Sequence, residues 1–226
     1  MCHTSRARRR RWTMNRALAA VRLCITGYFI FNIIRHMIAP GGNTGYTRML
    51  MFACLGTICI SFMLMVIGGP DRWPVIAEQA REAAGGSGPL SMLVLAGIIT
   101  VAVILPIGLL IGLGVLVGLR LSFFMALFFV PVLVRLVTAT SQQCMINGVV
   151  QMLIFFATML IGVGIVALLD RHASTLGVYI RHFHNIWPGY DDMSSARMFF
   201  AVTSFALANQ LVELVYAVLG LFGRKG

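Results

Sequence analysis

The first 34 residues read MCHTSRARRRRWTMNRALAAVRLCITGYFIFNII. Seven arginines stand within the first 22 of them, and an apolar stretch follows at once from Leu23. Cytoplasmic flanks of membrane-spanning helices are enriched in Lys and Arg. The pattern therefore predicts a membrane protein whose N-terminus is cytoplasmic. The arginines that set this orientation are Arg8, Arg9, Arg10, Arg11, Arg16 and Arg22.

The composition of the whole chain agrees with this class. Of 226 residues, 59% are hydrophobic and 11% are charged, and the mean hydropathy is +0.88. A soluble domain carries about 25% charged residues. The net charge of +11 would suit nucleic acid, but the basic residues gather before the first apolar stretch or stand singly at helix ends. We therefore expect the lipid bilayer as partner, not nucleic acid, and a bacterial inner (plasma) membrane location.

The apolar stretches predict an all-α, polytopic transmembrane bundle, because about 20 apolar residues cross a bilayer as a helix. A basic cytoplasmic segment, 1–16, precedes a single transmembrane domain, 17–222. Translation could instead start at Met14. The predicted orientation would then depend on Arg16 and Arg22 alone. The expected spans are about residues 17–38, 49–67, 90–119, 121–138, 149–169 and 197–222.

The number of spans depends on residues 121–138. This segment is short and contains Pro131 and Arg135, so it could also re-enter the membrane on the same side, which leaves five spans. Six spans place both basic ends of the chain inside. We favour six and keep five as the alternative.

Two short interfacial amphipathic helices are expected beside the spans. The first follows Asp71, with Pro74 in its first turn and Trp73 at the interface. The second lies in the connecting loop 170–196, where apolar residues recur at helical spacing opposite Arg181, His182 and His184. The apolar residues of this second helix are Leu176, Tyr179, Ile180, Phe183, Ile186 and Trp187.

Glu213 is the one acidic residue well inside an expected span. Its charge is costly to bury, so it needs a partner or a polar path. Asn209 and Tyr216 lie on the same side of the helix at i−4 and i+3, and Arg135 is the expected partner. Two interpretations remain: a polar clamp between helices, which we favour, or part of a proton or ion pathway.

Glycines in the third expected span suit close contact between helices. Gly108 and Gly112, and again Gly114 and Gly118, have the small-xxx-small spacing that lets helix backbones approach. We expect them at a helix-packing face.

Catalytic and cofactor motifs are missing from the sequence. It has no GxSxG, Walker loop, HExxH or CxxC, and only seven acidic residues. His182 and His184 resemble metal ligands, but their i, i+2 spacing on a helix points the rings apart. We therefore expect no catalytic, cofactor-binding or metal site, and an enzyme that uses this histidine-bearing loop stays the third alternative.

The first and last spans resemble those of small inner-membrane subunits of type IVB secretion and conjugal transfer machines. The resemblance rests on GYFIFNIIR, residues 27–35, before a Gly-rich turn, and on SARMFF, residues 195–200, entering a span with Asn209. The long span 90–119 departs from the pattern. The resemblance implies a non-enzymatic structural or assembly subunit that contacts other membrane subunits or itself. A small transporter or channel with a polar path near Glu213 is the alternative.

Overall fold

The computed structural model describes residues 3–42, 44–67, 72–83 and 140–222, together with residues 89, 93 and 97. Every regular element among these residues is a helix, as the sequence predicts. The elements are α1 (His3–Ile38), α2 (Thr44–Ile67), α3 (Trp73–Ala83), α7 (Ser141–Leu169), the 3-10 turn η3 (Asp170–His172), α8 (Ala173–His184) and α9 (Asp192–Phe222).

Four stretches within the described residues are long and apolar enough to cross a membrane. They fall on the first, second, fifth and sixth expected spans, which confirms a membrane-type helical chain at these places. The stretches are Arg16–Ile38, Thr44–Phe62, Gln142–His184 and Asp192–Phe222.

Several sequence predictions fall on parts that the structure does not describe. The third and fourth expected spans, 90–119 and 121–138, lie outside the described residues except for residues 93 and 97. Arg8 to Arg11 belong to the backbone of α1, but their side chains also lie outside the described part. Five further residues lie outside the described part entirely: Gly108, Gly112, Gly114, Gly118 and Arg135.

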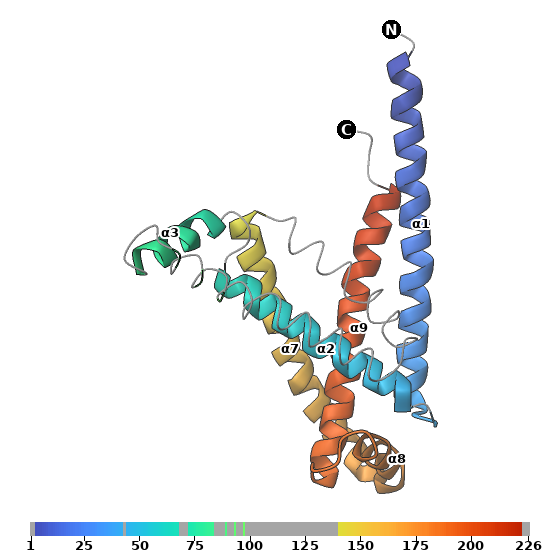
Figure 1. Ribbon diagram of the computed structural model, residues 1–226. Helices are drawn as coiled ribbons and strands as arrows, with labels where there is room; N and C mark the ends of the chain where they lie inside the picture. The colour runs from blue at the N-terminus through green and yellow to red at the C-terminus, as the bar shows by residue number, and fades with distance from the viewer. Residues whose placement is uncertain are drawn as a thin grey trace.

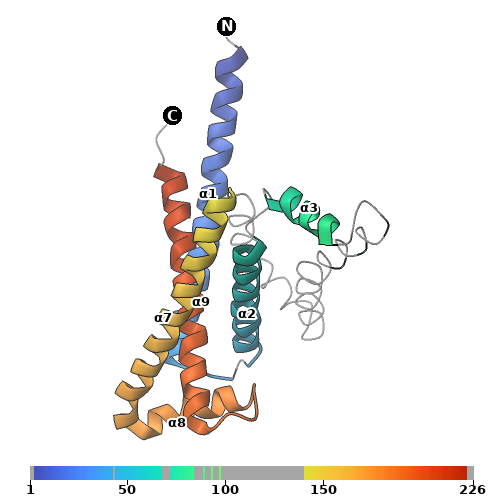
Figure 2. The ribbon, with the colours of Figure 1, turned by 90° about the vertical axis from the view of Figure 1, so that its left-hand side faces the viewer.

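The four long helices alternate in direction. Figures 1 and 2 both place the start of α1 and the end of α9 at one end of the molecule and α8 at the opposite end. Helices α1 and α9 lie side by side and antiparallel. Helices α2 and α7 diverge from them toward the end opposite α8 (Figure 1). The bundle is therefore closed at the α8 end and wider at the other.

The helices begin earlier than the apolar stretches because polar residues form their first turns. Helix α7 begins at Ser141, where the Thr140 N–H donates to Gln143 Oε1 at 3.2 Å. Helix α9 begins at Asp192, where the Ser194 N–H donates to Asp191 Oδ1 at 2.5 Å. Such side chains satisfy backbone groups that have no partner within the helix.

Helix α8 packs its apolar side against α9. Leu176, Tyr179 and Phe183 are buried in one cluster with Phe199 and Phe200 of α9. Trp187 of the following loop remains about half exposed. The buried side of α8 thus faces protein, and its position at a membrane interface stays a prediction.

Two glycines of α7 allow its close approach to α9 and α2. A Cβ atom at Gly162 would lie 2.9 Å from the backbone nitrogen of Ala201 in α9. At Gly148, a Cβ atom would lie 2.9 Å from the carbonyl oxygen of Ser61 in α2. Neither distance leaves room for a side chain, so these positions set how closely the helices pack. The sequence analysis singled out neither glycine.

Candidate functional site

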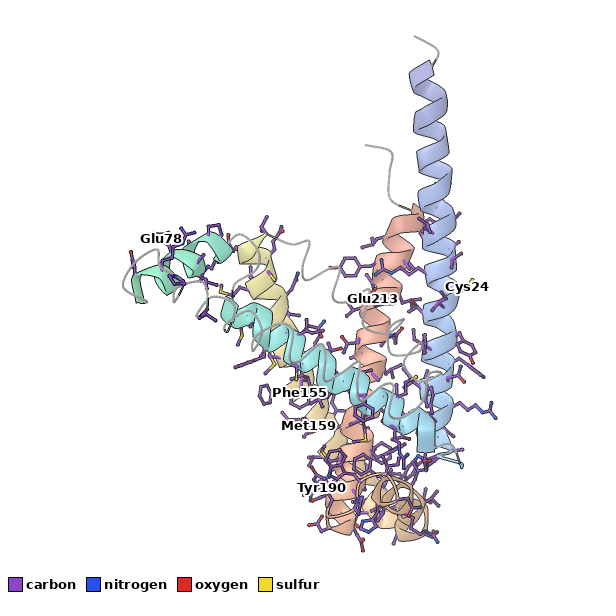
Figure 3. The ribbon with its side chains drawn as sticks, in the orientation of Figure 1. Cys24, Glu78, Phe155, Met159, Tyr190 and Glu213 are labelled. Carbon is purple, nitrogen blue, oxygen red and sulfur yellow. The ribbon has the colours of Figure 1, made fainter. Side chains whose placement is uncertain are left out.

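Glu213 is buried in α9 with 2% of its surface exposed. Its Oε2 atom forms an ion pair with the guanidinium of Arg22 in α1, whose side chain is 39% exposed. Figure 3 labels Glu213 on α9 and Cys24 on the neighbouring part of α1. A buried carboxylate needs a compensating charge or hydrogen bonds. Arg22 supplies that charge, and the pair thereby joins the first and last helices of the described chain.

Arg22, which the sequence marks only as an orientation signal, is a described partner of Glu213. The sequence analysis used Arg22 as an orientation signal and expected Arg135 as the partner of Glu213. Arg135 lies outside the described residues, and the described partner is Arg22. The expectation missed Arg22 because the sequence does not reveal that α1 and α9 lie side by side.

The polar residues around Glu213 do not form one continuous stripe. Asn209 is buried, and its Nδ2 donates to the Phe205 carbonyl of the same helix at 3.0 Å. Tyr216 is 46% exposed, so it does not share the buried environment of Glu213. A recess of about 160 Å³ borders the ion pair and is lined also by Thr26 and Gln210.

A second polar group, the histidine cluster, lies toward the α8 end and consists of His36 of α1, Thr47 of α2 and His182 of α8. The Nε2 atom of His36 lies 2.5 Å from Thr47 Oγ1, and Nε2 of His182 lies 2.7 Å from the same oxygen. All three residues are buried. One hydroxyl group therefore connects three helices.

Aromatic rings enclose the histidine cluster. The ring of His36 lies 5.1 Å from that of His182, 5.2 Å from that of Tyr46 and 5.4 Å from that of Phe199. Beside it, the Tyr179 hydroxyl donates to the Ile38 carbonyl at 3.0 Å, which ties α8 to the end of α1. Because these rings are apolar, the two Nε2 atoms and the Thr47 hydroxyl depend on the hydrogen bonds between them.

The placement of His182 corrects the sequence analysis, which put it on the polar face of an interfacial helix. His182 is 7% exposed, because the polar side of α8 meets Thr47 at the start of α2. His184 is exposed, so the two histidines do not converge. Across the described ranges no group of three His, Cys, Asp or Glu side chains could hold a metal ion.

The histidine cluster borders a larger opening, here called the Arg35 recess. Its volume is about 410 Å³. The residues that line it are Asn32, Arg35, His36, Ala39, Gly41 and Tyr46. The turn after α1 forms one wall, and Gly42 in that turn has a φ of 60°, which glycine adopts without strain.

The carboxylate of Asp191, outside the spans, has an unusually low pKa. The hydrogen bonds from Ser194 lower the pKa of this group from its ordinary value of 3.8, and Arg197 contributes in the same direction. The charged form is favoured because it accepts the N–H of a helix N-terminus. Asp191 is therefore a helix cap and not a proton donor at neutral pH.

The chain was compared with family models, with curated proteins and with solved structures, and none of them matches it.

Proposed function

We propose that this chain is a non-enzymatic structural or assembly subunit of a complex in the bacterial inner membrane. The observation that carries the proposal is the ion pair between Arg22 and Glu213. The arginine balances the charge of the carboxylate, so Glu213 needs no transported cation for that purpose. The pair serves as a clamp between α1 and α9, and the histidine cluster joins α1, α2 and α8 through hydrogen bonds.

The outer surface of the described helices supports a role among other membrane components. Large apolar side chains of α7 are exposed along one side, and lipid or neighbouring helices would cover them. Examples are Leu153, Phe156, Leu160 and Leu168. The resemblance of the first and last spans to conjugal transfer and secretion subunits favours a complex of that kind.

The described helices favour six spans over five. The end of α2 contacts the beginning of α7, because Gly148 lies against Ser61 and Met65. If both helices cross the membrane, the chain between them crosses an even number of times, so 90–119 and 121–138 would cross together. With a cytoplasmic N-terminus, residues 140–142 would be inside and α8 outside.

Cysteine labelling tests this topology. Single cysteines at Gln142 and Asn185, in a background without other cysteines, should react with an impermeant maleimide from opposite sides of the membrane. Gln142 should share the side of a cysteine at Arg16. Labelling of Gln142 from the opposite side to Arg16 would contradict the six-span arrangement.

A double substitution separates the clamp from a transport path. Arg22→Met with Glu213→Met replaces the ion pair by apolar side chains of similar volume, and such replacements are often tolerated. The subunit proposal expects this variant to enter its native membrane complex in wild-type amounts, measured by blue native electrophoresis of tagged chains. Loss of ion or proton flux in reconstituted vesicles, with the complex intact, would instead support the channel or transporter alternative.

A further inference from the structure

Arg35 lines the Arg35 recess and has no ionic partner among the residues that the structure describes. The described residues form two ion pairs, Arg22 with Glu213 and Arg81 with Glu78, and Arg35 takes part in neither. Arg35 nevertheless lines a recess of about 410 Å³, within the range of roughly 300–1,000 Å³ found for ligand pockets. The planar guanidinium of arginine can form two parallel hydrogen bonds with the oxygens of a carboxylate or a phosphate.

His36 offers a second donor to the same recess. Its Nε2 atom is engaged with Thr47 Oγ1, so Nδ1 is the ring nitrogen that remains available to a ligand. The ring is 7% exposed and borders the recess, so its orientation is fixed by packing. A donor with a fixed position costs little entropy when a ligand binds.

We propose that the Arg35 recess binds a phosphate group, carried by an anionic lipid headgroup or by free phosphate, through the Arg35 guanidinium and His36 Nδ1. Phosphate oxygens accept hydrogen bonds from both donors, and the arginine balances the negative charge. Asn32 and Tyr46, which also line the recess, add polar surface around the anion.

The surface beside the recess favours the lipid source. Phe31 and Ile38 are exposed, and they lie on the same side of α1 as Arg35 by helical spacing. Acyl chains could lie along these residues while the phosphate sits at the helix end.

A bound phosphate would also set the direction of the hydrogen bonds in the histidine cluster. When His36 Nδ1–H donates to the anion, the neutral ring has only an acceptor at Nε2, so the Thr47 hydroxyl must donate to it. Thr47 Oγ1 then accepts from His182 Nε2–H. The anion would thereby fix one arrangement across α1, α2 and α8, and should raise the temperature of unfolding.

The test uses the full chain in nanodiscs, in two arms. The first compares phosphatidylcholine discs with and without phosphatidylglycerol, and measures retained lipid by native mass spectrometry and stability by thermal unfolding. The second titrates inorganic phosphate into phosphatidylcholine discs by calorimetry. Arg35→Gln should weaken binding at least about tenfold, the loss expected for one charge-assisted contact.

Arg48→Gln is the matched control, because Arg48 is exposed near the same end of the molecule and does not line the recess. It should leave binding unchanged. His36→Gln provides an independent variant. Its amide oxygen can replace Nε2 as the acceptor of the Thr47 hydroxyl, but the variant removes the Nδ1 donor, so binding should weaken while stability without the anion persists.

Each outcome decides the proposal. Arg35-dependent binding in the lipid arm identifies a headgroup, and Arg35-dependent binding of inorganic phosphate alone identifies a free anion. An equal loss of affinity in Arg35→Gln and Arg48→Gln, or the absence of binding in both arms, would contradict the proposed phosphate site.

Discussion

The two polar groups inside the bundle stabilise it by different physics. The Arg22–Glu213 pair joins two helices through opposite charges, and one partner remains 39% exposed. The histidine cluster joins three helices through one neutral hydroxyl, enclosed by aromatic rings. A charge left behind in an apolar place costs more than a neutral polar group left behind. The ion pair should therefore be the more sensitive of the two to the loss of one partner.

The largest effect is expected from Glu213→Gln. The substitution leaves the Arg22 charge without its carboxylate and should lower the free energy of unfolding by about 3 kcal/mol, the low end for buried pairs because Arg22 is partly exposed. Chemical denaturation in detergent micelles measures this. Arg22→Met with Glu213→Met should recover most of the loss, and a double variant as unstable as the single one would contradict the clamp.

Thr47→Val should have the next largest effect. It removes the oxygen that both histidines contact, so two ring nitrogens lose a partner and the free energy of unfolding should fall by about 2 kcal/mol. The control is Thr57→Val in the same helix, because Thr57 is equally buried but its hydroxyl donates to the Ala53 carbonyl of its own helix. If Thr47→Val costs more than Glu213→Gln, the ranking of the two groups is wrong.

Gly162→Ala tests the packing of α7 on α9 at Arg197 and Ala201. The added methyl group would meet the backbone of Ala201 and Arg197, so the helices must separate, at a cost of about 1–2 kcal/mol. Gly164→Ala, where a Cβ meets nothing within 4 Å, should instead stabilise the helix by about 0.5–1 kcal/mol. Thermal unfolding of both variants checks the difference. Equal responses at the two positions would show that Gly162 does not limit the approach.

The smallest effect concerns Asp191, at the α8 end. The pKa of Asp191 is lower in the folded protein than the ordinary 3.8. The stabilisation that its charged carboxylate gives to the start of α9 is therefore present above pH 3.8 and is lost as the pH falls through the folded pKa. Amide exchange at Ser194 should therefore accelerate, relative to residues in the middle of α9, only in that acidic range. Asp191→Asn keeps an oxygen acceptor without the titration and should remove this pH dependence. Its persistence in the variant would assign the effect to another group.

The sequence predicted the helical class and the places of the four described spans, because their apolar stretches are long. It placed the beginnings of α2, α7 and α9 too late, since Thr44, Ser141 and Asp192 are polar and escape a search for apolar residues. Polar residues of this kind form first turns and caps. Hydropathy therefore locates the middle of a span better than its start.

The pairing of polar residues could be predicted only in part. The need of Glu213 for a partner follows from its burial in a span, but the identity of Arg22 depends on which helices are neighbours. His36 and His182 are far apart in sequence and meet only through Thr47. The apolar spacing in α8 includes Leu176, Tyr179 and Phe183, which are buried against α9, but this spacing could not reveal that His182 on the other side would also meet protein.

The two partners of the ion pair are separated by 191 positions along the chain. The ribosome synthesises Arg22 early in translation, and its partner Glu213 is added only with α9. A nascent or truncated chain therefore carries an unbalanced arginine at the membrane. Glu213 of α9 supplies the carboxylate that balances this charge.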